Sequence, residues 1–234
     1  MGRELIIAID GPSGAGKSTL SKALAENLGY LQINTGAMYR CVALAAARNN
    51  IDLDDGAALG SLAASLSIRF ERDGGDERVL LDGEDVSEAI RTPENSLRTS
   101  RVSAHLAVRQ AMLEQQRRLG REGGVVLEGR DIGTVVFPEA QVKFFLDATA
   151  AERGRRRWLE LKEKGLEVDL QQTITEVETR DAADSAREHA PLSRAEDAVT
   201  IDATALGVDE VLALMLITVQ QRRNGSRGLS GGEK

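Results

Sequence analysis

The sequence predicts an α/β protein whose mainly parallel sheet is flanked by helices. Segments with strand character alternate with segments of helical periodicity along the 234 residues, as in parallel α/β folds. Residues 5–9 form a continuous apolar run, which is typical of a strand buried on both faces. A glycine-rich turn follows it, and then a helix at residues 17–28 with Gly29 as its C-terminal cap.

The remaining segments continue this alternation, with one interruption. Further helices are expected at residues 36–48, 59–66, 93–119, 149–164, 169–185 and 208–223, and further strands at residues 125–128, 142–146 and 199–202. The interruption consists of short strands at residues 67–70 and 78–81 and near Val86, with a turn at residues 73–76. We therefore expect one domain at residues 1–223 with an antiparallel insertion at about residues 66–90, and a disordered tail at residues 224–234.

The composition argues against several classes of protein. Aromatic residues make up only 3% of the chain and the net charge is -7, which disfavours binding to nucleic acid polymers or acidic membrane surfaces. Cys41 is the single cysteine, so neither an intramolecular disulfide nor a thiolate zinc site is expected. We see no signal peptide or membrane span and expect a cytoplasmic protein. We also see no long, exposed apolar helix face that would need to be buried against a partner, so the expected state is a monomer.

The strongest motif directly follows the first strand. Residues 11–18 fit the pattern G-x-x-x-x-G-K-S/T, in which glycines turn backbone N–H groups toward phosphate oxygens and the next helix presents its positive end. Lys17 is expected to reach the β and γ phosphates of ATP, and Ser18 to supply a hydroxyl to Mg²⁺. The predicted ATP-binding residues are Gly11, Pro12, Ser13, Gly14, Ala15, Gly16, Lys17, Ser18 and Thr19.

The phosphate loop alone does not separate a switch GTPase from a small-molecule kinase. A GTPase would need the motifs N-K-x-D and D-x-x-G, and neither occurs in this chain. A kinase needs cationic groups around the transferred phosphoryl group, and arginine serves this purpose because its guanidinium is planar, always charged and bidentate.

Two groups of arginines stand out. Arg130 follows the strand at residues 125–128, and ligands of open α/β sheets bind beyond the carboxyl ends of strands. Arg153, Arg156 and Arg157 share a helix face. Like charges on one face are unfavourable unless an anion approaches, so we expect a lid that closes over ATP.

Several segments together resemble bacterial cytidylate kinases over about residues 4–222. They are Ile9-Asp10-Gly11-Pro12-Ser13-Gly14-Ala15-Gly16-Lys17, Thr35-Gly36-Ala37-Met38-Tyr39-Arg40, Gly83-Glu84-Asp85-Val86-Ser87, Ile90-Arg91-Thr92, Gly129-Arg130-Asp131-Ile132-Gly133-Thr134-Val135-Val136-Phe137-Pro138 and Ala190-Pro191-Leu192. The resemblance implies a P-loop nucleoside monophosphate kinase fold, with a small antiparallel sheet in the acceptor domain and a mobile helical lid at about residues 150–168. It also implies ATP as donor, Mg²⁺ as cofactor, and CMP and dCMP as acceptors.

The same resemblance assigns roles to individual residues. The expected catalytic group is Lys17, Arg130, Asp131, Arg153 and Arg157, of which the last two fall in the lid. The expected CMP-binding residues are Thr35, Arg40, Ser100, Arg109, Arg130, Asp131, Arg180, Asp184 and Arg187. Among these, Ser100 falls where the family reads the cytosine ring. Arg180, Asp184 and Arg187 match the group around the acceptor ribose and phosphate, and their spacing puts them on one helix face.

Some alternatives stay open at this point. The chain could be another monophosphate kinase, with UMP or AMP as acceptor. It could also be a regulatory nucleotide-binding protein, which would show no turnover. The carboxylate that supports Mg²⁺ is also open between Asp10, Glu128 and Asp131.

Overall fold

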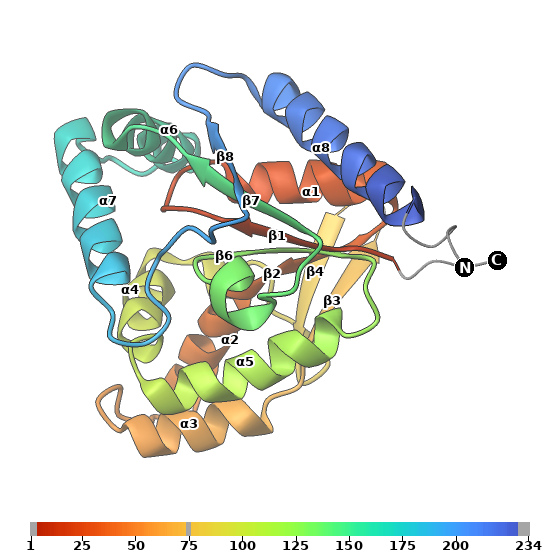
Figure 1. Ribbon diagram of the computed structural model, residues 1–234. Helices are drawn as coiled ribbons and strands as arrows, with labels where there is room; N and C mark the ends of the chain where they lie inside the picture. Colours follow the sequence, from red (N-terminus) through yellow and green to blue (C-terminus); the bar gives the residue numbers. More distant parts are fainter. Residues whose placement is uncertain (1–3, 74–75, 229–234) are drawn as a thin grey trace. The chain divides into compact units, whose positions relative to one another are not determined.

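Strand β1 (Ile6–Asp10) is buried along its whole length and lies at the centre of a five-stranded sheet (Figure 1). The structure is a computed structural model that describes residues 4–73 and 76–228. The strand order is β2-β6-β1-β7-β8. β1 pairs in parallel with β6 (Val125–Gly129) and β7 (Val142–Asp147), and β7 pairs in parallel with β8 (Val199–Asp202). The predicted mainly parallel sheet is confirmed.

The chain divides into two compact units, which we describe separately. Unit 1 contains the described parts of Met1–Gln32 and Gly123–Lys234, and unit 2 is Ile33–Glu122. In unit 1, helices α1 (Lys17–Leu28) and α8 (Val208–Gly228) lie side by side against the sheet (Figure 1). Apolar side chains of β1, β7, α1 and α8 form the core between them, which satisfies the amphipathic pattern of both helices.

Two further helices of unit 1 pack closely on each other. These are α6 (Ala150–Glu163) and α7 (Leu170–Ser185). Gly154 lies at their contact, where a Cβ atom would clash with Ile174. The loop after α7 returns to the helix end: Ala190 adopts a positive φ of 51°, and Leu192 N–H donates to the Asp184 carbonyl at 2.9 Å.

Unit 2 contains the predicted antiparallel insertion. Strands β3 (Ile68–Asp73), β4 (Asp76–Leu81) and β5 (Glu84–Asp85) form a three-stranded sheet, in which β4 pairs antiparallel with both neighbours. Of the predicted turn at residues 73–76, Gly74 and Gly75 lie outside the described residues. The helical elements of this unit are α2 (Thr35–Arg48), α3 (Gly56–Ser65), the 3₁₀ turn η1 (Ala89–Arg91), α4 (Pro93–Val102) and α5 (Leu106–Gly120).

The structure adds elements that the pattern of residues does not predict. β2 (Leu31–Asn34) is a strand with alternating rather than continuous apolar residues, so it lacks the signal that marks the other strands. Residues Ile132–Val136 form a single π-helical segment, η2. α8 is helical as far as Gly228, whereas a tail is expected from residue 224; residues 229–234 lie outside the described residues, and their disorder stays a prediction. Among the helices of the described chain, none is both long and apolar enough to cross a bilayer.

Candidate active site

The loop between β1 and α1 can take its conformation only because glycines occupy it. Gly11 has a φ of +148°, and a Cβ atom there would clash with the carbonyl oxygen of Leu146. Gly14 has a φ of +76°, and its Cβ would come within 2.9 Å of the Arg153 carbonyl oxygen. Side chains rarely adopt such φ values, so both the backbone path and the close approach of β7 and α6 depend on these positions.

The start of α1 concentrates positive charge. Gly16 is the N-cap and provides no side-chain acceptor to the first turn, which leaves the N–H groups of that turn to a ligand. Lys17 is buried, and its Nζ donates to the Pro12 carbonyl at 2.6 Å. Burial and the neighbouring Arg130 guanidinium hold the pKa of the Lys17 ammonium well below its usual value, and Arg180 acts in the same direction. Lys17, Arg130 and Arg180 form what we call the cationic cluster.

Two buried carboxylates of unit 1 lie beside this cluster. The Ser18 hydroxyl donates to Glu128 Oε2 at 2.8 Å, which joins the first turn of α1 to the end of β6. Asp10 ends β1 and accepts hydrogen bonds from the N–H groups of Ile132 at 2.8 Å and Gly133 at 2.7 Å. Burial raises the pKa of Asp10 to about 6 against the lowering effect of these two bonds. Asp10 therefore anchors the segment that follows Arg130 and Asp131.

Asp184 on α7 is the acceptor that holds Arg130. Its side chain is only 5% exposed, and Oδ2 accepts from Arg130 Nε at 2.9 Å. Arg187, which lies just beyond the end of α7, pairs with the other oxygen. The spacing predicts Arg180, Asp184 and Arg187 on one helix face, and the structure corrects this for Arg187, because α7 ends at Ser185. Arg180 is half-buried, and its charge acts on Lys17.

The arginines of α6 do not form the uncompensated charged face that their spacing predicts. Each has a carboxylate partner: Arg153 pairs with Asp181, Arg155 and Arg156 with Glu152 at 2.8 and 2.9 Å, and Arg157 with Glu160 at 3.0 Å. Hydrogen bonds from Arg155 and then Arg156 lower the pKa of Glu152 to about 2. The physical reason is spacing, because Glu152 and Glu160 lie three or four residues from their partners on the same helix.

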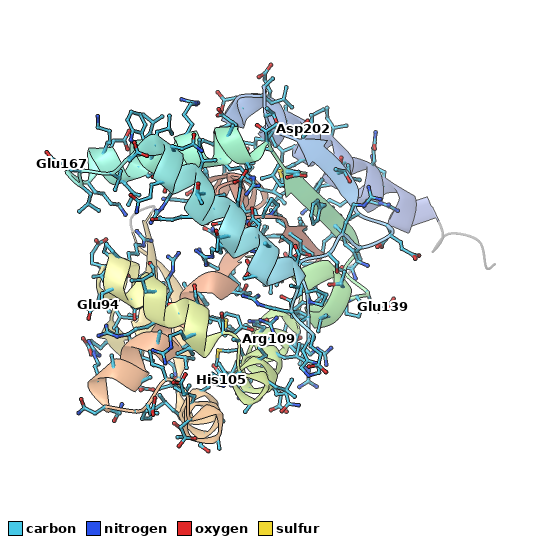
Figure 2. All side chains as sticks on the ribbon, turned by 90° about the vertical axis from the view of Figure 1, so that its left-hand side faces the viewer. Glu94, His105, Arg109, Glu139, Glu167 and Asp202 are labelled. Atoms are coloured by element: carbon cyan, nitrogen blue, oxygen red, sulfur yellow. The ribbon has the colours of Figure 1, made fainter. Side chains whose placement is uncertain are left out.

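Unit 2 carries the other predicted acceptor residues. Thr35 is buried at the first position of α2, and Arg40 is half-buried on the same helix. Arg109 lies one turn after His105 at the start of α5 (Figure 2) and places its guanidinium 5.6 Å from the centre of the Tyr39 ring. This distance is that of a cation–π contact. Ser100 is exposed on α4.

Sequence reasoning missed two side chains that hold the predicted residues in place. Asn95 is buried on α4, and its amide donates to the carbonyls of Arg40 and Ile90, both at 3.1 Å. Asp181 on α7 accepts from the Ser13 N–H of the loop at 3.0 Å and pairs with Arg153. A buried asparagine and a second helix carboxylate give no motif, so only the tertiary contacts identify them.

Together, the fold and this site define a P-loop phosphotransferase. A buried strand, a glycine loop, an uncapped helix N-terminus and a buried lysine form the phosphate-binding half. Arg130, directly after β6, and Arg180 on α7 add positive charge that acts on this lysine, as transfer of a charged phosphoryl group requires.

Comparison with known proteins defines the family. The family model of cytidylate kinase matches residues 7–221. A cytidylate kinase of Syntrophotalea carbinolica is 66% identical over 223 residues, covering 95% of each chain, and one of Geobacter sulfurreducens is 59% identical over 226 residues, covering 97% of each. A solved shikimate kinase of Acinetobacter baumannii aligns with a TM-score of 0.45 at 14% identity over 93% of this chain and 94% of that one. The chain belongs to the cytidylate kinase family, and the resemblance drawn from the sequence is confirmed.

We expect the variant Asp184→Asn to lower the free energy of unfolding by about 2 kcal/mol, because an amide leaves two partly buried guanidinium groups without their counter-charge. Arg130 and Arg187 retain some access to water, which keeps the cost below that of a fully buried pair. Urea unfolding at pH 7 measures it. Glu178→Gln is the matched control, since Glu178 is exposed on the same helix, and it should stay within about 0.5 kcal/mol of wild type. Equal stability of both variants would contradict the ion-pair assignment.

Proposed function

We propose that the chain transfers the γ-phosphoryl group of ATP to CMP and dCMP, with CDP or dCDP and ADP as products. Membership in the cytidylate kinase family supports the reaction. The cationic cluster is the observation that carries it, because Lys17 is a buried cation whose charge is disfavoured by burial and by the two arginines. A phosphoryl group reverses that balance, since its negative charge favours the ammonium form of Lys17.

The donor half of the site is the glycine loop with Lys17. Loop N–H groups and the first turn of α1 would receive the β phosphate of ATP, and Lys17 would bridge toward the γ phosphate. Its bond to the Pro12 carbonyl shows that the side chain folds back over the loop. Ser13, Gly14 and Ala15 complete the predicted contact surface, while Ser18 and Thr19 are exposed at the helix start.

Among the three carboxylates that the sequence leaves open, Glu128 fits Mg²⁺ best. It accepts from the Ser18 hydroxyl, so two oxygen groups suited to this ion already lie together. Asp10 instead accepts two backbone N–H groups, which fixes its orientation toward the segment after Asp131. In the described part of the chain, no three His, Cys, Asp or Glu side chains gather in a way that suits a metal ion. This agrees with Mg²⁺, which commonly takes one or two protein oxygens together with phosphates and water.

In unit 1, the residues proposed to bind the acceptor are arginines. We infer that Arg130, held by Asp184, binds the phosphate of CMP, and that Arg187 and Arg180 lie around its ribose and phosphate. Thr35, Arg40, Ser100 and Arg109 are the proposed contacts of unit 2. Arg153 and Arg157 are proposed to act from the lid at about residues 150–168, and Asp131 from the loop after β6.

The chemistry requires no protein nucleophile. An oxygen of the acceptor phosphate attacks the γ phosphorus, the bond to the β–γ bridging oxygen breaks, and ADP leaves with that oxygen. The residues contribute position and positive charge while negative charge spreads over the equatorial oxygens.

We further infer that the described core with its insertion and lid works as a single kinase domain, and that the enzyme is a cytoplasmic monomer.

Coupled measurement of ADP release with one acceptor at a time tests the proposed function. CMP and dCMP should support turnover with kcat/KM at least tenfold above UMP, AMP, GMP and dTMP. Asp184→Asn should lower kcat/KM for CMP at least tenfold and leave KM for ATP within twofold. A preference for UMP or AMP would make the chain another monophosphate kinase. Absence of turnover with every acceptor would indicate a nucleotide-binding protein and sink the proposal.

A separate prediction addresses the metal. Glu128→Gln should raise the Mg²⁺ concentration needed for half-maximal turnover at least tenfold, because the amide contributes no charge to the ion. The matched control is Glu139→Gln, an exposed carboxylate in the loop before β7 (Figure 2). An unchanged Mg²⁺ titration of the Glu128 variant would exclude Glu128 as the Mg²⁺ ligand and make Asp131 the next candidate.

A further inference from the structure

Both backbone groups of one phosphate-loop residue are bonded by side chains from α6 and α7. Ser13 N–H donates to Asp181 Oδ1 at 3.0 Å. The Ser13 carbonyl accepts from Arg153 Nη1 at 2.9 Å. Two helices far along the chain therefore determine the orientation of the peptide groups on either side of Ser13.

An ion pair between the same two side chains closes the ring. Arg153 Nη1 donates to Asp181 Oδ2, and the two side chains are only 8% and 14% exposed. Arg153 Nε is also fixed, because it donates to the Ala148 carbonyl at 2.8 Å. Gly14 permits this arrangement, since any side chain there would press on the backbone of Arg153. We call Ser13, Arg153 and Asp181 the loop bracket.

We propose that Asp181 is a positioning residue for the donor half of the reaction, and that it acts through Ser13 and Arg153. This inference rests on the proposed use of ATP. The carboxylate holds the peptide groups of the loop and aims the guanidinium of Arg153 at the same place. ATP then meets the other N–H donors of the loop and a cation that are already oriented, and its binding does not have to order them.

The position of the bracket distinguishes this role from general stabilisation of α7. Asp181 and Asp184 lie three residues apart on that helix, yet they bond different partners. Asp181 bonds the phosphate loop and Arg153, whereas Asp184 bonds Arg130 and Arg187. Removing Asp181 leaves a buried guanidinium without its counter-charge. Arg153 must then turn away from the loop or draw another anion toward it.

The test separates donor binding from acceptor binding. Calorimetry with ATP and Mg²⁺ gives the Kd of the wild type and of Asp181→Ala and Asp181→Asn, with Glu178→Gln as the control on the exposed side of the same helix. Both Asp181 variants should bind ATP at least tenfold more weakly and keep KM for CMP within twofold at saturating ATP. Asp181→Asn retains the shape of the side chain, so it reports on the carboxylate even where Asp181→Ala folds poorly.

A double-mutant cycle tests the path through Arg153. Adding Asp181→Ala to Arg153→Ala should weaken ATP binding by clearly less than the tenfold seen in the wild-type background, because the effect that passes through Arg153 is already lost and only the bond to the Ser13 N–H remains. A full tenfold further loss would overturn the path through Arg153. A wild type that binds no ATP would overturn the proposed function together with this inference. A wild type that binds ATP, with unchanged or tighter binding by the Asp181 variants, would overturn this inference alone. An equal weakening of ATP binding and CMP binding by the Asp181 variants would also overturn this inference, because it would indicate a purely structural role.

Discussion

Burial of the Lys17 ammonium next to Arg130 and Arg180 is the constraint on which the rest of the site depends. Three cations near one helix N-terminus repel one another, and removal from water makes the charge of Lys17 more costly still. The fold tolerates this arrangement because carboxylates on neighbouring elements offset it. Glu128 and Asp10 favour the charged form of Lys17, and Asp184 binds Arg130 directly.

Each carboxylate also has a mechanical role, and each connects different elements of unit 1. Asp10 ties the end of β1 to η2, Glu128 ties the end of β6 to α1, and Asp184 ties α7 to the end of β6. Asp181 ties α7 to the phosphate loop. The carboxyl ends of parallel strands meet at one edge of the sheet, so these links converge where a nucleotide is expected. The electrostatic and the structural demands on the site are thus met by the same side chains.

The local patterns of the sequence predict the parts of this site that depend on neighbours along the chain. The continuous apolar run of β1, the glycines of the loop and the helical period of α1 are all local, and the structure has these elements. The salt bridges of Arg155, Arg156 and Arg157 were also within reach, because their partners lie on the same helix. The predicted uncompensated face was wrong because Glu152 and Glu160 supply negative charge on the same helix.

Contacts between distant segments were not predictable in the same way. Arg130 and Asp184 meet only after β6 and α7 have packed, so no local pattern pairs them. The same holds for Asp181, whose partner Ser13 lies near the start of the chain. β2 has too few apolar residues in a row to be recognised, and the π-helical segment η2 follows from the two hydrogen bonds to Asp10 rather than from any periodicity.

The variant Lys17→Met tests the role of the buried ammonium group, because it keeps the bulk of the side chain and removes the charge. We expect opposite effects on stability and activity. The unfolding temperature at pH 7 should be at least as high as that of the wild type, since a cation destabilised by burial and by Arg130 is gone. At the same time kcat for phosphoryl transfer from ATP to CMP should fall by about 10²–10³-fold or more. A variant that keeps near-normal kcat, or that unfolds at a clearly lower temperature, would contradict the account.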